Sequence, residues 1–185
     1  MKIKKIRLSW TLLNLWDRGN IDRAVQAYFH IGGSITRQMK EGKELHEKIA
    51  KYIDAHKAFP EWFFNYDLKS PETEKEIVVS YNKYFNLKGF FDCYDSATKT
   101  LFEFKTGKTD SLTWARSGQV PLYFLLGELA GLEIERALLV RYNQYIKETD
   151  FCIIHNSKKL RDGARNLIDS VGIEIHSFFL DNNLL

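Results

Sequence analysis

Residues 87–105 read LKGFFDCYDSATKTLFEFK, which is two apolar runs separated by the polar turn DSATK at residues 95–99. Both runs are rich in aromatic and aliphatic residues, and short runs of this kind bounded by turn residues are typical of β-strands. Side chains alternate across a strand, so the second run places Leu101, Glu103 and Lys105 on one face and its phenylalanines on the other. The stretch therefore predicts two neighbouring strands with charged side chains embedded in them.

The embedded charges indicate a metal-dependent site. Asp92 in the first run and Glu103 in the second are carboxylates in otherwise apolar strands. If the strands pair, the carboxylates approach and repel each other unless a cation neutralises them, and Mg²⁺ or Mn²⁺ is the natural choice for oxygen ligands. The ammonium of Lys105, next to a metal-bound water, would lower the pKa of that water or stabilise charge on a phosphate. An ordinary ion pair on a solvated strand face is the alternative interpretation.

The segments around these two strands alternate between helical and strand-like patterns. Upstream, apolar residues at helical spacing predict helices at residues 10–16, 21–29 and 36–56, followed by an aromatic loop at 59–71. Further strands are predicted at 76–81, 136–142, 151–155 and 173–180, and further helices at 112–131 and 157–171. This order predicts an α/β fold with a central mixed sheet and an N-terminal helical portion.

Length and composition are those of one globular domain. The chain has 185 residues, of which 44% are hydrophobic and 28% charged, enough to bury a core. No run approaches the ~20 apolar residues of a membrane helix, and the basic start lacks the features of a signal peptide. We therefore expect no membrane partner and a cytoplasmic location, whether the protein is encoded by a cell, a virus or a mobile element. The net charge of +3 does not by itself indicate nucleic-acid binding.

Five short motifs resemble the RecB-like branch of the PD-(D/E)XK nuclease superfamily. They are LSWTL at 8–12, GKELH at 42–46, GFFD at 89–92, EFKTG at 103–107 and QVPLY at 119–123. That branch shows G-x-x-D on one strand, an acidic residue with x-K-T-G on the next, Q-x-x-x-Y on the following helix, and an upstream histidine after a glycine. The likeness runs from about Ser9 to Tyr142.

The resemblance implies a fold and a set of metal ligands. It implies a single domain over residues 1–185, with a restriction-endonuclease-like core at 71–185 and a helical portion at 1–70 that covers the site. The implied ligands of Mg²⁺ or Mn²⁺ are the side chains of His46, Asp92 and Glu103 and the carbonyl of Phe104. Lys105 would position or activate the attacking water. Outside this context, His46 would be interpreted as an ordinary surface histidine.

Three further positions take their roles from the same resemblance. Gln119 and Tyr123, one helical turn apart, would support the catalytic site and contact the DNA backbone. The alternative is a packed tyrosine and a solvated glutamine. An additional acidic residue on the preceding strand is either Glu76 or Glu74, and a plain exposed carboxylate is an equal alternative for both.

The cysteines mark a departure from the family pattern. The chain is similar in layout to the CRISPR-associated RecB-like exonucleases, which hold an iron–sulfur cluster with four cysteines, but it has only Cys93 and Cys152. We expect two free thiols and no iron–sulfur cluster. No G-x-x-x-x-G-K-[ST] motif occurs, so a helicase or recombination partner would have to be a separate protein.

Basic residues gather on the predicted helix near the C-terminus, at Lys158, Lys159, Arg161 and Arg165. They are candidates for phosphate contacts, and a solvated helix face with interspersed acidic residues is the alternative.

These observations predict a Mg²⁺- or Mn²⁺-dependent DNA nuclease, a RecB-like exonuclease acting at single-stranded or duplex ends in repair or recombination. One alternative is a catalytically silent nucleic-acid-binding or protein-interaction module with the same fold. The intact set of Asp92, Glu103 and Lys105 argues against it. An endonuclease acting on DNA or RNA is another, although the chain has no separate recognition domain of the kind expected for a site-specific restriction enzyme.

Overall fold

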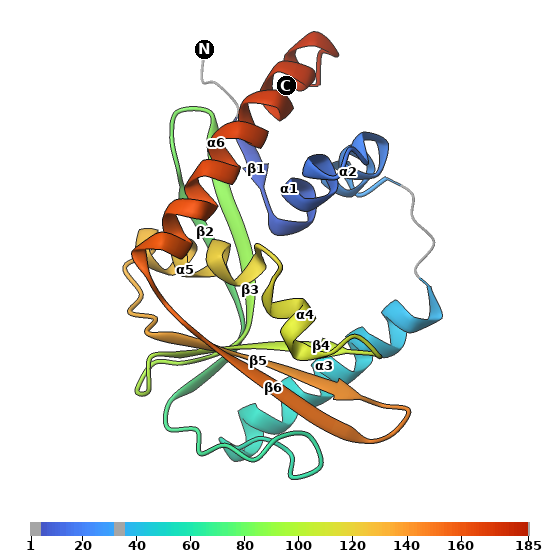
Figure 1. Ribbon diagram of the computed structural model, residues 1–185, viewed down its shortest axis with the longest axis vertical. Coiled ribbons are helices and arrows are strands. Elements are labelled where there is room, and N and C mark those ends of the chain that lie inside the picture. Colours follow the sequence, from blue (N-terminus) through green and yellow to red (C-terminus); the bar gives the residue numbers. More distant parts are fainter. Residues whose placement is uncertain (1–4, 32–35, 185) are drawn as a thin grey trace.

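The computed structural model describes residues 5–31 and 36–184, which form one mixed sheet with helices on both faces (Figure 1). The α/β fold with a central mixed sheet that the sequence predicts is confirmed. The strands are β1 Ile6–Leu8, β2 Pro71–Ser80, β3 Phe85–Asp95, β4 Thr100–Thr106, β5 Arg136–Asn143 and β6 Glu148–His155. The helices are α1 Trp10–Asp17, α2 Ile21–Phe29, α3 Arg37–His56, α4 Ser111–Ala115, α5 Gln119–Leu129 and α6 Lys158–Asp181.

The long strand β3 organises the sheet. Along one edge it pairs with antiparallel β2. The opposite edge is shared, because β1 pairs in parallel with residues 85–87 and β4 pairs in antiparallel fashion with residues 93–95. Residues 88–92 lie between these two partners, where β1 and β4 part from each other. We call this gap the β3 wedge. Beyond it, β5 lies parallel to β4, and β6 lies antiparallel to β5.

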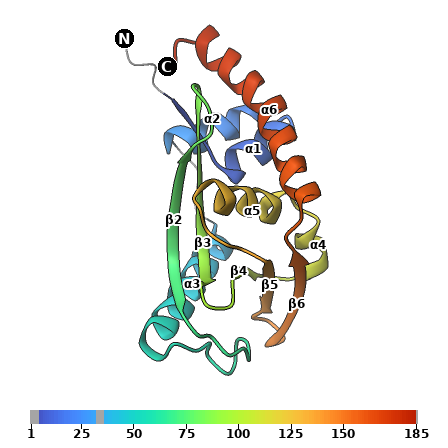
Figure 2. The ribbon, with the colours of Figure 1, turned by 90° about the vertical axis from the view of Figure 1, so that its left-hand side faces the viewer.

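Two apolar cores lie on the two faces of the sheet. One includes α1, α5 and α6 packed against the sheet, and Figure 2 shows α5 between the β2–β3 pair and α6. The other includes α3 and the aromatic loop that follows it. The alternation predicted for β4 is confirmed, because Leu101 lies in the first core whereas Phe102 and Phe104 lie in the second. Charged groups of β4 therefore share the face that α5 covers.

The helix predicted at 112–131 is in fact two helices, α4 and α5, separated at residues 116–118. The break has a packing reason. A Cβ atom at Gly118 would lie only 2.7 Å from Cζ3 of Trp10, so the first helix of the chain reaches the start of α5 at this glycine. Apolar periodicity on both sides of the break conceals it in the sequence.

The strand predicted at 173–180 is wrong, since α6 continues without interruption to Asp181. Ile168, Val171, Ile175 and Phe179 are buried at helical spacing, whereas Ile173 is 68% exposed. The local alternation of apolar and polar residues at 173–176 imitates a strand. Strand β1 was not predicted at all, because three residues are too few to establish a period.

None of the helices among the described residues combines the length and apolar character that a bilayer crossing needs. Both cysteines are free thiols, with Cys93 buried in the core and Cys152 half-buried on β6.

Candidate active site

Asp92 and Glu103 meet where β3 and β4 begin to separate. The last backbone pair next to them is Cys93 with Phe102. Beyond that pair, Oδ2 of Asp92 accepts a hydrogen bond of 2.6 Å from the backbone N–H of Phe104. Glu103 is almost completely buried, with 3% of its surface exposed. The charge of Asp92 acts on Glu103, so the two carboxylates lie near each other as expected, and Asp92 is held by the backbone of the neighbouring strand.

A network of side chains holds Glu103 from the α5 side. Nζ of Lys105 donates to Oε1 of Glu103 at 2.6 Å and to Oε1 of Gln119 at 2.9 Å. Nε2 of Gln119 donates to the same Glu103 oxygen at 2.7 Å and to the hydroxyl of Tyr123 at 3.0 Å. Gln119 and Tyr123 are one turn apart on α5, as expected; Gln119 contacts Glu103 and Lys105 directly, and Tyr123 contacts Gln119.

Gly89 on β3 allows α5 to approach this closely. A Cβ atom there would lie 2.7 Å from Cδ1 of Leu126 and 3.0 Å from Cε1 of Tyr123. The glycine of the G-x-x-D motif therefore has a packing role, because any side chain at this position would push Tyr123 away from the sheet.

The carboxylate of Glu103 is in an unfavourable electrostatic environment. Burial raises its pKa to about 7, and the nearby charge of Asp92 raises it as well, while Lys105 acts in the opposite direction. Its second oxygen, Oε2, is buried and has no hydrogen-bond partner within residues 5–31 and 36–184. Burial also raises the pKa of Tyr123 well above its usual value, so this hydroxyl stays protonated. A positive charge beside Glu103 would relieve this situation.

His46 reaches the site from α3 on the other face. Its Nδ1 lies 3.5 Å from Oδ1 of Asp92. Burial alone would lower the pKa of His46, but Asp92 and Glu103 raise it above its usual value. One turn earlier, a Cβ atom at Gly42 would lie 2.9 Å from Oγ1 of Thr106, so this glycine allows α3 to approach the end of β4. The histidine found through its motif is therefore beside the carboxylates.

Of Glu74 and Glu76, Glu74 is the residue on which the charge of Asp92 acts, although its side chain is exposed, and its role in the site stays a prediction. Glu74 has φ of 48° and interrupts the regular pairing of β2 with β3 opposite Asp92. Burial raises the pKa of Glu74, and the charge of Asp92 contributes to the same shift. Glu76 instead forms an ion pair of 2.6 Å with Lys88.

The donor set suits a hard divalent cation. Asp92, Glu103 and His46 bring two carboxylates and an imidazole together, and Oε2 of Glu103, which has no partner in the part of the chain that the structure describes, could serve as a ligand atom. Among residues 5–31 and 36–184, no three His, Cys, Asp or Glu side chains already converge as a metal-ligand group. Glu103 is turned to Lys105 and Asp92 to the N–H of Phe104, so binding a cation would require these side chains to exchange partners.

The structure does not bring the basic residues of α6 to this site. Arg161 and Arg165 both pair with Glu128 near the end of α5, about nine residues from Gln119, which at 1.5 Å per residue is roughly 13 Å along the helix. Lys158 pairs with Asp162 on its own helix at 3.4 Å, and Lys159 is exposed. Their proposed contact with nucleic acid remains a prediction.

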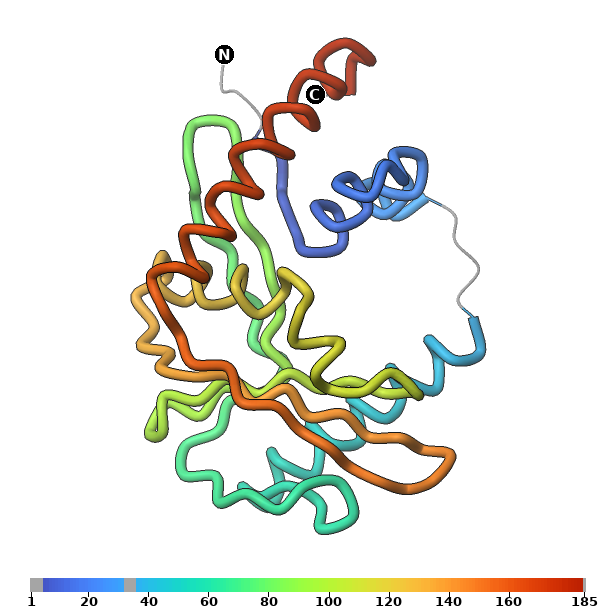
Figure 3. Tube along the Cα trace, viewed as in Figure 1, coloured from blue at the N-terminus to red at the C-terminus, as the bar shows by residue number. Residues whose placement is uncertain are grey.

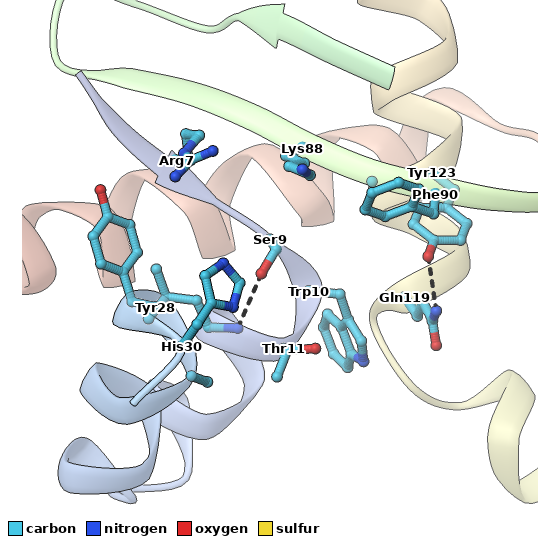
Figure 4. A pocket seen from close by; sticks show the side chains of 13 residues that line it. Arg7, Ser9, Trp10, Thr11, Tyr28, His30, Lys88, Phe90, Gln119 and Tyr123 are labelled. Atoms are coloured by element: carbon cyan, nitrogen blue, oxygen red, sulfur yellow. Dashed lines mark hydrogen bonds between the residues drawn. The ribbon is translucent and has the colours of Figure 1, made fainter. Parts of the chain in front are cut away.

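A pocket that was not predicted opens beside Gln119 and Tyr123. It is a cavity of about 420 Å³ in the β3 wedge, lined by residues of β1, α1, α2, β3 and α5. Figure 4 shows Arg7 and Tyr28 toward one end and Gln119 and Tyr123 at the other, with Trp10 between them. Lys88 also lines it. The cationic and aromatic side chains that line the pocket are far apart in the sequence. They come together only because β1 and β4 separate along β3, which the sequence alone does not show.

Sequence comparisons and structural comparisons give different results. No family model and no curated protein sequence matches the chain. Among solved structures, the protein SSO0001 has a TM-score of 0.60 at 15% identity, over 92% of this chain and 77% of that one. The alkaline exonuclease LHK-Exo from Laribacter hongkongensis has 0.56 at 12%, over 96% and 93%. A phage-related exonuclease from Haemophilus somnus has 0.56 at 12%, over 91% and 92%. These likenesses establish a shared fold.

Proposed function

We propose that this protein is a Mg²⁺- or Mn²⁺-dependent nuclease that hydrolyses phosphodiester bonds of DNA and acts at strand ends. The observation that carries the proposal is the clustering of Asp92, Glu103, His46 and Lys105. In this cluster the second, buried oxygen of Glu103 has no hydrogen-bond partner among the described residues. The fold shared with two exonucleases supports the proposal.

The residues of the chain divide the chemical work. His46, Asp92, Glu103 and the carbonyl of Phe104 would hold the cation, which would supply an activated water and neutralise charge on the phosphate. Lys105 would place its ammonium where negative charge develops as the phosphate is attacked.

Gln119 would hold the side chains of Glu103 and Lys105 in a fixed relative position, because its amide hydrogen-bonds to both and also donates to the hydroxyl of Tyr123. Glu74 would add negative charge near Asp92 and so favour a cation there.

The pocket supports action at an end. LHK-Exo has been solved in complex with dAMP, and a cavity of about 420 Å³ beside Gln119 is large enough for one nucleotide. Arg7 would contact its phosphate, Lys88 would join it by exchanging its pairing with Glu76, and Trp10 offers an aromatic face for the base. Because the pocket receives a single unit beside the reacting centre, a free strand end fits it better than the interior of a duplex.

The decisive experiment compares linear DNA with the same DNA closed into a circle, single- and double-stranded, with Mg²⁺, Mn²⁺ or chelator. We expect metal-dependent release of nucleotides from linear DNA and little cleavage of circles. Asp92→Asn and Lys105→Ala should abolish or strongly reduce it, whereas Asp169→Asn, a remote carboxylate that binds Tyr81, should not. Undiminished cleavage in chelator or by Asp92→Asn would refute a metal nuclease, and equal rates on circles would refute the end requirement.

A further inference from the structure

The ring of Trp114 covers the ammonium of Lys105. Nζ of Lys105 lies 5.0 Å from the centroid of the Trp114 ring, a distance at which the face of an indole attracts a cation. On other sides the ammonium donates to Glu103 and Gln119. The lysine of the E-x-K-T-G motif is thus enclosed by two hydrogen-bond acceptors and one aromatic ring.

The position of the ring is fixed by the short helix α4, which the chain forms between β4 and α5 (Figure 3). The side chain of Asp110 caps the start of α4 by accepting from the N–H of Thr113 at 2.8 Å. Oδ1 of Asp150 on β6 accepts from the N–H of Ser111 at 2.9 Å, and Asp150 also pairs with Arg141 on β5. Helix α4 is therefore tied to the β5–β6 pair, independently of α5.

Trp114 is held by packing and not through its N–H group. It lies at the margin of the core formed with α5 and α6, and its buried Nε1 has no hydrogen-bond partner among the described residues. A tryptophan kept for its N–H would be expected to have an acceptor. What this residue offers to its surroundings is its ring face, and the charged group over that face is Lys105.

We propose that Trp114 is a positioning residue that keeps the Lys105 ammonium directed at the reacting phosphate. Lysine has a flexible four-carbon stem, and its charge must be held in one place to act on a transition state. If Glu103 exchanges Lys105 for a cation, the strongest partner of the ammonium is lost. Gln119 and the ring of Trp114 then remain to hold it. The proposal rests on the proposed function, in which Lys105 acts on the phosphate.

The first test is kinetic. Trp114→Met and Trp114→Leu remove the aromatic face, Trp114→Phe keeps one, and Tyr84→Leu removes a comparable ring over Lys83 at 4.7 Å on the distant β2–β3 turn. On linear single-stranded DNA, we expect kcat of the Met and Leu variants to fall roughly 3- to 30-fold, the range that corresponds to an ordinary cation–π contact. KM should stay nearly constant, and Trp114→Phe and Tyr84→Leu should remain close to the wild type.

The second test does not depend on nuclease activity. Reductive methylation of the metal-free protein, followed by mass spectrometry of the peptide that contains Lys105, measures how freely the ammonium is exposed. We expect faster methylation of Lys105 in the Met and Leu variants than in the wild type and in Trp114→Phe, with thermal melts confirming that each variant is folded. If the Leu variant does not fold, the unbranched Met variant provides the comparison.

The kinetic and methylation measurements distinguish failure of the Trp114 proposal from failure of the proposed nuclease function. A Phe variant as impaired as the Met variant, a parallel rise in KM, or unchanged methylation of Lys105 would overturn a positioning role for Trp114. If the wild type cleaves no DNA while Lys105 methylation responds as expected, the proposed function fails, and the pairing of Trp114 with Lys105 stands without it.

Discussion

At the scale of single residues, Glu103 shows how the site trades stability for function. A buried carboxylate is costly unless every oxygen finds a partner, and here one oxygen has none among the residues that the structure describes, while Asp92 lies close by. Lys105 and Gln119 share the other oxygen. Lys105 relieves the repulsion only in part, because the pKa of Glu103 stays raised. A bound cation would therefore stabilise this site.

The first prediction concerns Glu103→Gln. Above the raised pKa of Glu103, about 7, the wild type carries the unfavourable charge, and the amide does not. We expect the free energy of unfolding of the metal-free protein to rise by about 1–3 kcal/mol in mildly alkaline buffer, while cleavage is lost. Urea unfolding in chelator measures the first effect. A less stable Gln variant would mean that Lys105 fully compensates the charge.

Asp95 is the opposite case, a buried carboxylate whose oxygens are satisfied. Its oxygens accept from the backbone N–H groups of Lys69 and Ser70, both at 2.9 Å. Burial alone would raise the pKa of Asp95, but these donors overcome it and lower the pKa below the ordinary 3.8. The stabilisation is therefore complete above the ordinary pKa and is lost as pH falls through the lowered one.

The second prediction follows from that sign. Asp95→Asn should reduce the free energy of unfolding by about 2–3 kcal/mol at neutral pH, because hydrogen bonds to a charged acceptor are lost. The difference from the wild type should shrink in acid, where the wild-type carboxylate is itself protonated. Urea unfolding across this pH range measures it, with the exposed Asp67→Asn as control. A difference independent of pH would contradict the role of the charge.

At the scale of elements, the position of α3 depends on a glycine. Gly42 lies against Oγ1 of Thr106, one turn before His46. Gly163 lies within α6 in open space, where an added Cβ meets nothing within 4 Å. Both are glycines inside helices, so replacement by alanine carries the same gain in helix propensity, and only the contact differs.

The third prediction uses that pair. Gly163→Ala should raise the free energy of unfolding by roughly 0.5–1 kcal/mol and leave cleavage unchanged. In Gly42→Ala, the close contact of the new Cβ atom with Thr106 should cancel this gain in stability. It should also move His46 away from Asp92 and reduce turnover. Thermal melts and initial rates on linear DNA measure both. Equal stabilisation by the two variants with full activity would show that α3 adjusts without consequence for the site.

Elements with a clear period were predictable, and those shaped by tertiary contacts were not. The alternation in β4 identified the faces of Glu103 and Lys105 correctly, because a strand fixes its side-chain directions locally. The break before Gly118 depends on packing against Trp10, which no local pattern records. The helical spacing of Ile168, Val171, Ile175 and Phe179 is present in the sequence, but the alternation at residues 173–176 competes with it. The resemblance to a family motif singled out His46, and the structure places it beside Asp92. The role of Trp114 had no such signal, since the ring meets Lys105 only through the tie between α4 and β6.

At the scale of the whole molecule, the basic residues of the pocket and those of α6 lie in separate places. Arg7 and Lys88 line the pocket in the β3 wedge, next to Gln119. The basic residues of α6 lie near the other end of α5, and two of them are paired with Glu128. The wedge exists because β1 and β4 pair with different residues along the same edge of β3, and its pocket reaches Gln119 and Tyr123.

The last prediction distinguishes the pocket from the basic face of α6 by the kind of DNA that each binds. A basic residue inside the pocket should bind a phosphate only at a strand end. A basic residue on an open helix face should bind phosphates of any strand. We expect Arg7→Gln to weaken binding of linear single-stranded DNA, and to reduce the salt dependence of that binding by about one phosphate contact, without affecting circular DNA. Lys158→Gln on α6 should weaken the binding of linear and of circular DNA by equal and small amounts, because the Lys158 ammonium is exposed and pairs with Asp162. Fluorescence anisotropy over a range of salt concentrations, in chelator so that no DNA is cleaved, measures both variants. A uniform loss in Arg7→Gln would make the pocket a general phosphate contact, and a large loss in Lys158→Gln would place the main DNA path over α6.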